Sequence, residues 1–442
     1  MAYEPLPKAF GAPEGSAPRC SEAHLRIRMK RRRLIWYYGW NVAAVAILFQ
    51  VVVSGVAITS FSLWVSSWTQ AFHAERAPVL SAMTLTLIIS GTLSPTVGSL
   101  LDRRPIRTMV TFGLLCFAAG FFLLSVSTAL WQIIAVYGVL MGISTTLCGS
   151  IVAQTLMTKW FLARTGLAIG IALTGLSLGG VVMPPLLAFL LSAIGWRSAA
   201  AVIAGIGLAL IPLVLLVIRN SPGDLGLDPE REAIIAEAAP RSNPEFVSAG
   251  KLLLHPNFWP MVVTFVPLFT ALKAMGANFG PITSDLGIST ATAAIFLSVN
   301  NVCTIIGKIV IGRIADRSDA RLILLLFVLI TSAGFMLMLG HPPSTRVLLA
   351  TVLLGAGSAC LYPMQGILIR RYFGVIGFGR VLGTLNVFFL LSAFGGQVAG
   401  AVRDRVGNYN FFLLACAIAP LLLGLTVLRL KRYDQIERRA WS

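Results

Sequence analysis

Apolar segments long enough to cross a lipid bilayer recur along almost the whole chain of 442 residues. A helix needs about 20 mostly apolar residues to span the hydrocarbon core. Charged residues make up 12% of the chain, about half the share of a soluble domain. The segments do not alternate in polarity as barrel strands do, so an all-α membrane protein is predicted. Twelve transmembrane helices are expected, at 38–63, 80–101, 108–127, 131–157, 165–192, 197–218, 258–281, 291–313, 321–340, 345–369, 380–402 and 410–430.

Positive charge is distributed unevenly between the two sides of the predicted membrane. With the N-terminus placed inside, most of the 35 lysines and arginines fall in the tail, the inner loops and the C-terminus. This distribution follows the positive-inside rule, so both termini are predicted to be cytoplasmic, at the plasma membrane. The net charge of +18 therefore indicates topology and attraction to membrane lipid, and it does not indicate a nucleic-acid partner. The outer loops hold Arg76, Arg197, Arg346, Arg403 and Arg405.

The chain shows no pattern of catalytic or metal-binding residues. Its six cysteines have no paired spacing, so neither a disulfide framework nor a metal site is predicted. No nucleophile with a neighbouring base occurs in or near the spans, which argues against an enzyme. We expect no cofactor.

Lys273 and Lys308 lie inside predicted spans, and no span carries a carboxylate that would neutralise them. A charge within hydrocarbon costs at least about 2.5–3.5 kcal/mol, so such residues face a polar cavity and usually serve function. A positive charge without a built-in partner favours an anionic ligand.

A short charged motif occurs twice, six spans apart, with identical internal spacing. Internal repeats of this kind build many secondary transporters, in which the substrate site lies at the repeat interface. The recurring residues are Gly98, Asp102, Arg103 and Arg107 after the second span, and Gly312, Asp316, Arg317 and Arg321 after the eighth.

With Gly-x-x-x-Asp-Arg in both places, residues 36–432 resemble the major facilitator superfamily. The resemblance implies two pseudo-symmetric six-helix bundles around a cavity that opens alternately to either side. It also implies that the motif residues gate the cytoplasmic side, because each aspartate caps a helix of the opposite bundle. Carried over, Asp102 would meet the start of span eleven near Gly379, and Asp316 the start of span five near Thr165.

The resemblance and the composition together predict five segments and a protein that works as a monomer. The segments are a basic cytoplasmic tail (1–35), an N-terminal bundle (36–218), a cytoplasmic linker (219–257), a C-terminal bundle (258–432) and a C-terminal tail (433–442).

Within the superfamily, short motifs such as Tyr38-Gly39-Trp40 resemble the monocarboxylate transporters and the bacterial oxalate/formate exchangers. In that branch a basic residue of span eight, four positions before the motif glycine, pairs with the substrate carboxylate. Lys308 stands at that position, about 12 Å inside the cytoplasmic end by helical rise. The acidic residue that the monocarboxylate transporters carry one turn earlier is Thr304 here.

Two interpretations of Lys273 stay open. It shares a helical face with Phe269 and Gly276, which suits a cavity-lining helix. It also lies toward the outside, where it could reach the interface or pair with Asp285. Further candidates for substrate contact are Tyr362, Gln365, Gln50, Gln154, Asn301 and Asn386.

The sequence thus predicts a secondary active transporter of a small organic anion, a mono- or dicarboxylate, coupled to protons or working by exchange. A drug/proton antiporter is the alternative. Such a pump usually has an acidic residue that binds cations, and no predicted span carries one. A non-transporting sensor on the same fold is a further alternative.

Overall fold

The computed structural model describes residues 37–74, 76–161, 164–225, 252–316, 318–374 and 377–430. The predicted tails 1–35 and 433–442, residues 226–251 of the predicted linker, and Arg317 lie outside the described residues. The helices discussed below belong to one unit that begins at Gly39. Within the described ranges the regular structure is helical and contains no strand, which confirms the predicted all-α class.

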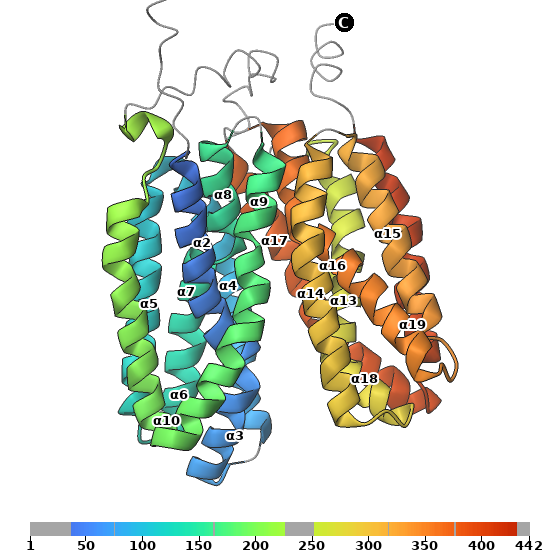
Figure 1. Cartoon of the computed structure of the whole chain (residues 1–442), viewed down its shortest axis with the longest axis horizontal. Coiled ribbons are helices and arrows are strands. Elements are labelled where there is room, and N and C mark those ends of the chain that lie inside the picture. Colours follow the sequence, from blue (N-terminus) through green and yellow to red (C-terminus); the bar gives the residue numbers. More distant parts are fainter. Residues whose placement is uncertain are drawn as a thin grey trace, which may run out of the picture. The chain divides into compact units, whose positions relative to one another are not determined.

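The N-terminal half of this unit is shown from blue to green in Figure 1. Its elements are α2 (Gly39–Ser54), the π-helical turn η1 (Gly55–Thr59), α3 (Phe61–Phe72), α4 (Arg76–Arg103), α5 (Ile106–Ser125), α6 (Leu130–Val136), the π-helical turn η2 (Tyr137–Met141), α7 (Gly142–Leu147), α8 (Ser150–Trp160), α9 (Thr165–Ala172), α10 (Thr174–Val217) and the 3₁₀ helix η3 (Pro222–Leu225).

The C-terminal half runs from yellow to red in Figure 1. Its elements are α13 (Phe258–Asp285), α14 (Thr290–Ala315), α15 (Ala320–Leu337), α16 (Ser344–Phe373), α17 (Phe378–Phe388), the 3₁₀ helix η5 (Phe389–Phe394), α18 (Gly395–Val406), α19 (Asn410–Gly424) and the 3₁₀ helix η6 (Leu425–Arg429).

Eleven described stretches are long and apolar enough to cross a membrane, and one of them makes two crossings. This stretch, Thr165–Val217, has 53 residues, about twice what a single crossing needs. Its direction changes at Gly195, whose φ of 74° lies in the left-handed region that glycine adopts readily. Just beyond its last turn, the carbonyl oxygen of Arg219 accepts a hydrogen bond (2.9 Å) from the indole N–H of Trp160, which lies five residues before the stretch begins. Both ends of the stretch therefore lie at the same end of the bundle, and the twelve predicted crossings are present.

The two halves approach most closely where glycines replace side chains. A Cβ added at Gly312 of α14 would clash with the backbone oxygen of Gly166 in α9. The pseudo-equivalent contact joins Gly98 of α4 and Gly379 of α17, where an added Cβ would meet backbone in the same way. Small residues let helix backbones approach closely, so the motif side chains can reach helix starts in the opposite half.

At these contacts the motif aspartates bind the N-termini of opposite helices. The Asp316 carboxylate accepts hydrogen bonds from the N–H groups of Gly166 (2.7 Å) and Leu167 (3.1 Å). Asp102 accepts from Gly379 and from the residue after it, at 3.2 Å each. The structure thus has both contacts that the family resemblance implies, and they hold the two halves together at the end of the molecule that carries the two aspartates, here called the motif end.

The motif arginines Arg103, Arg107 and Arg321 also lie near the motif end. Arg321 does not cross the interface: it pairs with Asp319 at 2.8 Å, and Asp319 caps α15 of the same half. The hydrogen bonds from Arg321 hold the pKa of the Asp319 carboxyl below its usual value. Arg103 is exposed and Arg107 is half-buried. The gating role of these arginines stays a prediction.

Lys308 forms a third link between the halves. Its ammonium group donates to the carbonyl oxygen of Leu173 (2.9 Å) and to the hydroxyl of Ser177 (2.8 Å). Leu173 lies at the break between α9 and α10, where carbonyl groups at a helix C-terminus lack intrahelical partners and favour a cation. Lys308 is only 3% exposed, so these two acceptors replace water around its charge.

We expect Asp316→Ala to loosen the motif end more than Asp102→Ala, because the bonds of Asp316 are shorter. Hydrogen bonds to a charged group contribute about 1.5–3 kcal/mol, enough to shift a two-state equilibrium measurably. Double electron–electron resonance measures the distance between spin labels at the exposed Thr108 and Leu322, one in each half, after replacement of the native cysteines. A longer distance component should appear in both variants.

Asp319→Ala is the matched control, since this aspartate caps a helix within its own half. It should lower the melting temperature without adding a longer distance. If the distances were unchanged in both motif variants, the aspartates would not hold the halves together.

Lys308→Met should also populate the longer distance, because methionine keeps the length of the side chain but cannot donate to Leu173 and Ser177. The control is Arg371→Met, which removes donors to Ala315 and Ser318 of the same half. A distance distribution identical to that of the unmodified chain would show that Lys308 does not link the halves.

Candidate functional site

A cavity of about 380 Å³ lies between the two halves. Its volume falls within the range of about 300–1,000 Å³ that small-molecule sites occupy. Both halves contribute to its lining, so it lies where the repeat predicts a substrate site. From the N-terminal half it is lined by Ser54, Ile58, Met83, Thr86, Leu87, Ser90, Gly91, Ser94, Thr145, Thr146, Gly149, Ser150, Ile151 and Leu176. From the C-terminal half it is lined by Phe269, Lys273, Ala277, Tyr362, Asn386, Phe389, Leu390, Ser392 and Gly396.

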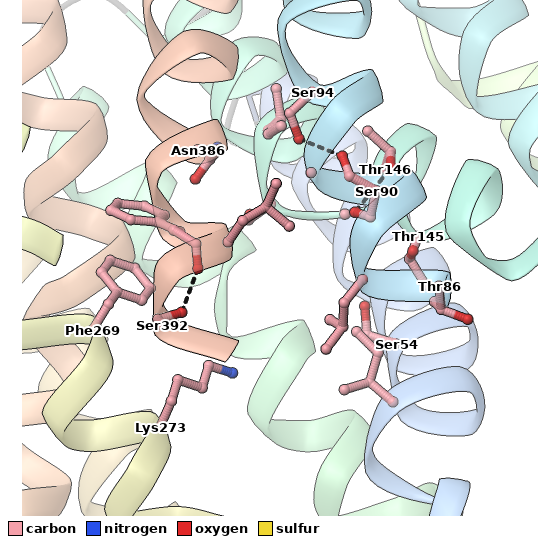
Figure 2. Close-up of a pocket in the computed structure, with 18 of the residues that line it drawn as sticks. Ser54, Thr86, Ser90, Ser94, Thr145, Thr146, Phe269, Lys273, Asn386 and Ser392 are labelled. Atoms are coloured by element: carbon pink, nitrogen blue, oxygen red, sulfur yellow. Dashed lines mark hydrogen bonds between the residues drawn. The ribbon is translucent and has the colours of Figure 1, made fainter. Parts of the chain in front are cut away.

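Lys273 is the only charged residue in this lining. Figure 2 shows its side chain reaching from α13 toward the cavity. Among the described residues it has no carboxylate partner, and Asp285 pairs instead with Arg403 at 3.3 Å. The alternative pairing of Lys273 with Asp285 is therefore absent from this conformation. A lysine that faces a cavity without a counterion is a candidate binding group for an anion.

Aromatic side chains form the surface next to Lys273. The rings of Phe269 and Phe389 stack with centroids 4.0 Å apart, and Tyr362 meets Phe269 edge to face at 5.2 Å. Phe269 lies one helical turn before Lys273 on α13, so the charge and the ring face the same side. This wall can hold the apolar part of a ligand while the ammonium group holds a charged end.

Hydroxyl groups form the opposite wall. Thr86, Ser90 and Ser94 of α4 are spaced four residues apart and lie on one helical face, and Figure 2 shows them opposite Lys273. Thr145 and Thr146 of α7 extend this surface. None of these hydroxyl residues is among the candidates predicted from the sequence, although the four-residue spacing on the second span is a signal that could have identified them.

Three of the candidate substrate residues line the cavity: Lys273, Tyr362 and Asn386. Gln365 is buried beneath it and donates to the side-chain oxygen of Asn386 at 3.3 Å. The four others, Lys308, Gln50, Gln154 and Asn301, are not part of its lining in this conformation.

These four side chains lie at helix contacts. Gln50 donates to the carbonyl oxygens of Ala46 (2.9 Å) and Ala172 (2.8 Å), which ties α2 to α9. Gln154 is fully buried, and neither side-chain polar atom has a hydrogen-bond partner among the described residues. Lys308 occupies the link described above, and Asn301 is half-buried on α14. Their part in substrate binding stays a prediction.

No cluster of three or more histidine, cysteine, aspartate or glutamate side chains occurs among the described residues, so a metal centre cannot be built from them. The described cysteines are all free thiols, and four are buried. The cavity therefore offers one ammonium group, an aromatic surface and a set of hydroxyls, which suit binding and not covalent chemistry.

The chain is similar in sequence to known transporters along most of its length. Monocarboxylate transporter 13 of Rattus norvegicus is 27% identical over 401 residues, covering 88% of each chain. The uncharacterised MFS-type transporter YcxA of Bacillus subtilis (strain 168) is 25% identical over 383 residues, covering 83% of this chain and 88% of that one.

Among solved structures, the proton:xylose symporter XylE, bound to 6-bromo-6-deoxy-D-glucose, matches with a TM-score of 0.71. The match covers 91% of this chain and 98% of that chain at 13% identity, so it shows a shared fold. The family model of the Major Facilitator Superfamily matches residues 46–281 and 268–440. The chain therefore belongs to the Major Facilitator Superfamily and is an integral membrane transporter of small molecules, not an enzyme.

Proposed function

We propose that this transporter carries a small organic anion with a single carboxylate, and that the ammonium group of Lys273 binds this carboxylate. The observation that carries the proposal is the position of Lys273, the one charged residue that lines the cavity between the halves. A single cation balances a single negative charge. Of the predicted mono- and dicarboxylates, the proposal therefore selects the monocarboxylates.

The relatives support the same substrate class. Several are named monocarboxylate transporters, among them the rat relative at 27% identity. Identity at this level does not transfer a substrate by itself, and Thr304 replaces the acidic residue expected of that branch. The cavity lysine is therefore the stronger support.

The proposal includes an orientation and a conformation. The positive-inside rule puts the motif end on the cytoplasmic side of the plasma membrane, with both termini inside. The motif end is closed, so this conformation would be the outward-facing state. Opening of the motif end would separate Lys308 from Leu173, and its released ammonium group could then receive the carboxylate on the inner side. One chain supplies both walls of the cavity, which fits a transporter that works as a monomer.

The alternative of a drug/proton antiporter has weaker support. A carrier of organic cations needs a negative group in or near its site, because desolvation of an unpaired cation is costly. No described residue that lines the cavity has a carboxylate. An uncompensated lysine in the cavity would repel such a cation.

The unpaired lysine also limits how the empty carrier returns. Inversion without a ligand would bury the charge of Lys273 unneutralised, at a cost of at least about 2.5–3.5 kcal/mol. Two return routes avoid this cost: a second anion occupies the site, or the lysine releases its proton. The first route gives exchange and the second gives proton-coupled transport.

Lys273→Gln should lower carboxylate uptake into proteoliposomes by about 10- to 100-fold, because a hydrogen bond to a charged group contributes about 1.5–3 kcal/mol. The measurement is initial uptake from a panel of labelled mono- and dicarboxylates, with a cationic dye in the same assay. Lys273→Arg keeps the charge and is the control that should retain uptake.

Undiminished carboxylate uptake by Lys273→Gln, or transport of the dye in preference to every acid, would reject the proposal. Melting temperatures of both variants establish that a loss of uptake is not a loss of fold.

Uptake measured with different vesicle contents and with a pH gradient distinguishes the two return routes. Under exchange, unlabelled acid inside the vesicle should accelerate uptake several-fold, and a pH gradient should have little effect. Under proton coupling, an acidic outside should drive accumulation into empty vesicles. Uptake that responds to neither condition would contradict the argument from the unpaired charge.

A further inference from the structure

The two walls of the cavity present different chemistry to a ligand. The wall from the C-terminal half carries the ammonium group and the aromatic rings, whereas the wall from the N-terminal half is neutral and rich in hydroxyls (Figure 2). A carboxylate held by Lys273 accounts for the first wall only. The hydroxyl side chains on the second wall are Ser54, Thr86, Ser90, Ser94, Thr145, Thr146 and Ser150.

Four of these seven hydroxyl groups donate their protons to backbone carbonyl oxygens one helical turn earlier. Thr86 donates to the carbonyl of Ala82 (2.9 Å), and Thr145 donates to the carbonyl of Met141 (2.7 Å). Ser94 donates to the backbone oxygen of Ser90 at 2.7 Å. A hydroxyl group has one proton and two acceptor lone pairs, so each oxygen keeps accepting capacity after its proton is used.

Thr146 shows the same arrangement with one more contact. Its hydroxyl donates to the carbonyl oxygen of Gly142 (2.7 Å) and lies 3.0 Å from the hydroxyl oxygen of Ser90. The hydroxyl wall, defined by the seven residues named above, therefore offers acceptor lone pairs throughout, and Ser54, Ser90 and Ser150 keep protons that they can donate.

An acceptor surface complements a ligand that brings its own donors. An ionised carboxylate has only acceptors, so it pairs with Lys273 and with fewer groups of this wall than a hydroxyl group, which both donates and accepts. A cationic donor such as an ammonium group would face Lys273 with no carboxylate in the cavity lining to balance it. Neutral hydroxyl groups remain as the donors that fit.

We infer that the cavity selects polyhydroxylated monocarboxylates, whose carboxylate binds Lys273 and whose chain hydroxyls donate to the hydroxyl wall. This inference rests on the proposed function and adds the part of the ligand that the lysine does not recognise. The aromatic surface of Phe269 and Phe389 then packs against the C–H groups of the chain. A plain alkyl acid would leave the acceptors of the wall unpaired once the cavity closes and excludes water.

Gluconate and hexanoate test this inference, since both are six-carbon monocarboxylates and only gluconate has chain hydroxyls. The full-length chain in proteoliposomes should take up gluconate with kcat/KM at least about tenfold above that of hexanoate. Gluconate should also raise the melting temperature of the detergent-solubilised protein more than hexanoate at equal concentration.

Variants of the wall show whether the preference comes from these oxygens. Ser90→Ala and Thr146→Val should each lower kcat/KM for gluconate about tenfold, whereas kcat/KM for hexanoate should not fall and should rise where the removed oxygen was unpaired. Thr92→Val is the matched control, because Thr92 lies on the same helix α4 and donates to its own helix in the same way, but is exposed and outside the lining. It should change neither value.

The outcomes separate the inference from the proposed function. Hexanoate handled as well as gluconate, with both lost in Lys273→Gln, would overturn the inference and leave the carboxylate carrier standing. A gluconate preference that survives both wall variants would likewise overturn it. If no carboxylate were transported at all, the proposed function would fail and the inference with it.

Discussion

The contact between a motif aspartate and the first N–H groups of a helix in the opposite half is the interaction on which the cavity depends. Asp316 and Asp102 each supply a carboxylate where helix N–H groups have no intrahelical partner. These contacts need close backbone approach, which the glycines at Gly312 and Gly98 allow. Because each aspartate binds through a few hydrogen bonds and no covalent link, separation of the two halves at the motif end would cost only a few hydrogen bonds to charged groups.

The two membrane lysines have different surroundings. The ammonium group of Lys308 donates to the carbonyl oxygen of Leu173, at a helix break in the opposite half, so it stabilises the conformation in which the halves meet at the motif end. Lys273 has no such partner among the described residues and faces the cavity. The same residue type therefore has two consequences, and the difference comes from the acceptors within reach of each ammonium group.

The sequence predicts the parts of this arrangement that repeat and fails where a contact depends on helix rotation. The positions of Asp102 and Asp316 follow from a motif that occurs twice at fixed spacing. Which of the two lysines lines the cavity does not follow from the sequence, because depth along a helix says nothing about which neighbour a side chain meets. Lys308 donates to the carbonyl oxygen of Leu173, at the break between α9 and α10. The residues around this break are continuously apolar, so the hydropathy of the sequence does not reveal it.

A ligand that touches both walls has a consequence for transport that binding to one wall lacks. A ligand stabilises the closing of the cavity only to the extent that it binds the closed state better than the open one. A carboxylate can bind Lys273 before the opposite wall approaches, and it removes the cost of burying this charge when the cavity closes. Wall residues such as Ser90 and Thr146 gain a ligand partner only when the walls come together around the ligand. The hydroxyl wall should therefore matter more for the rate of transport than for the first binding step, whereas Lys273 should matter for both.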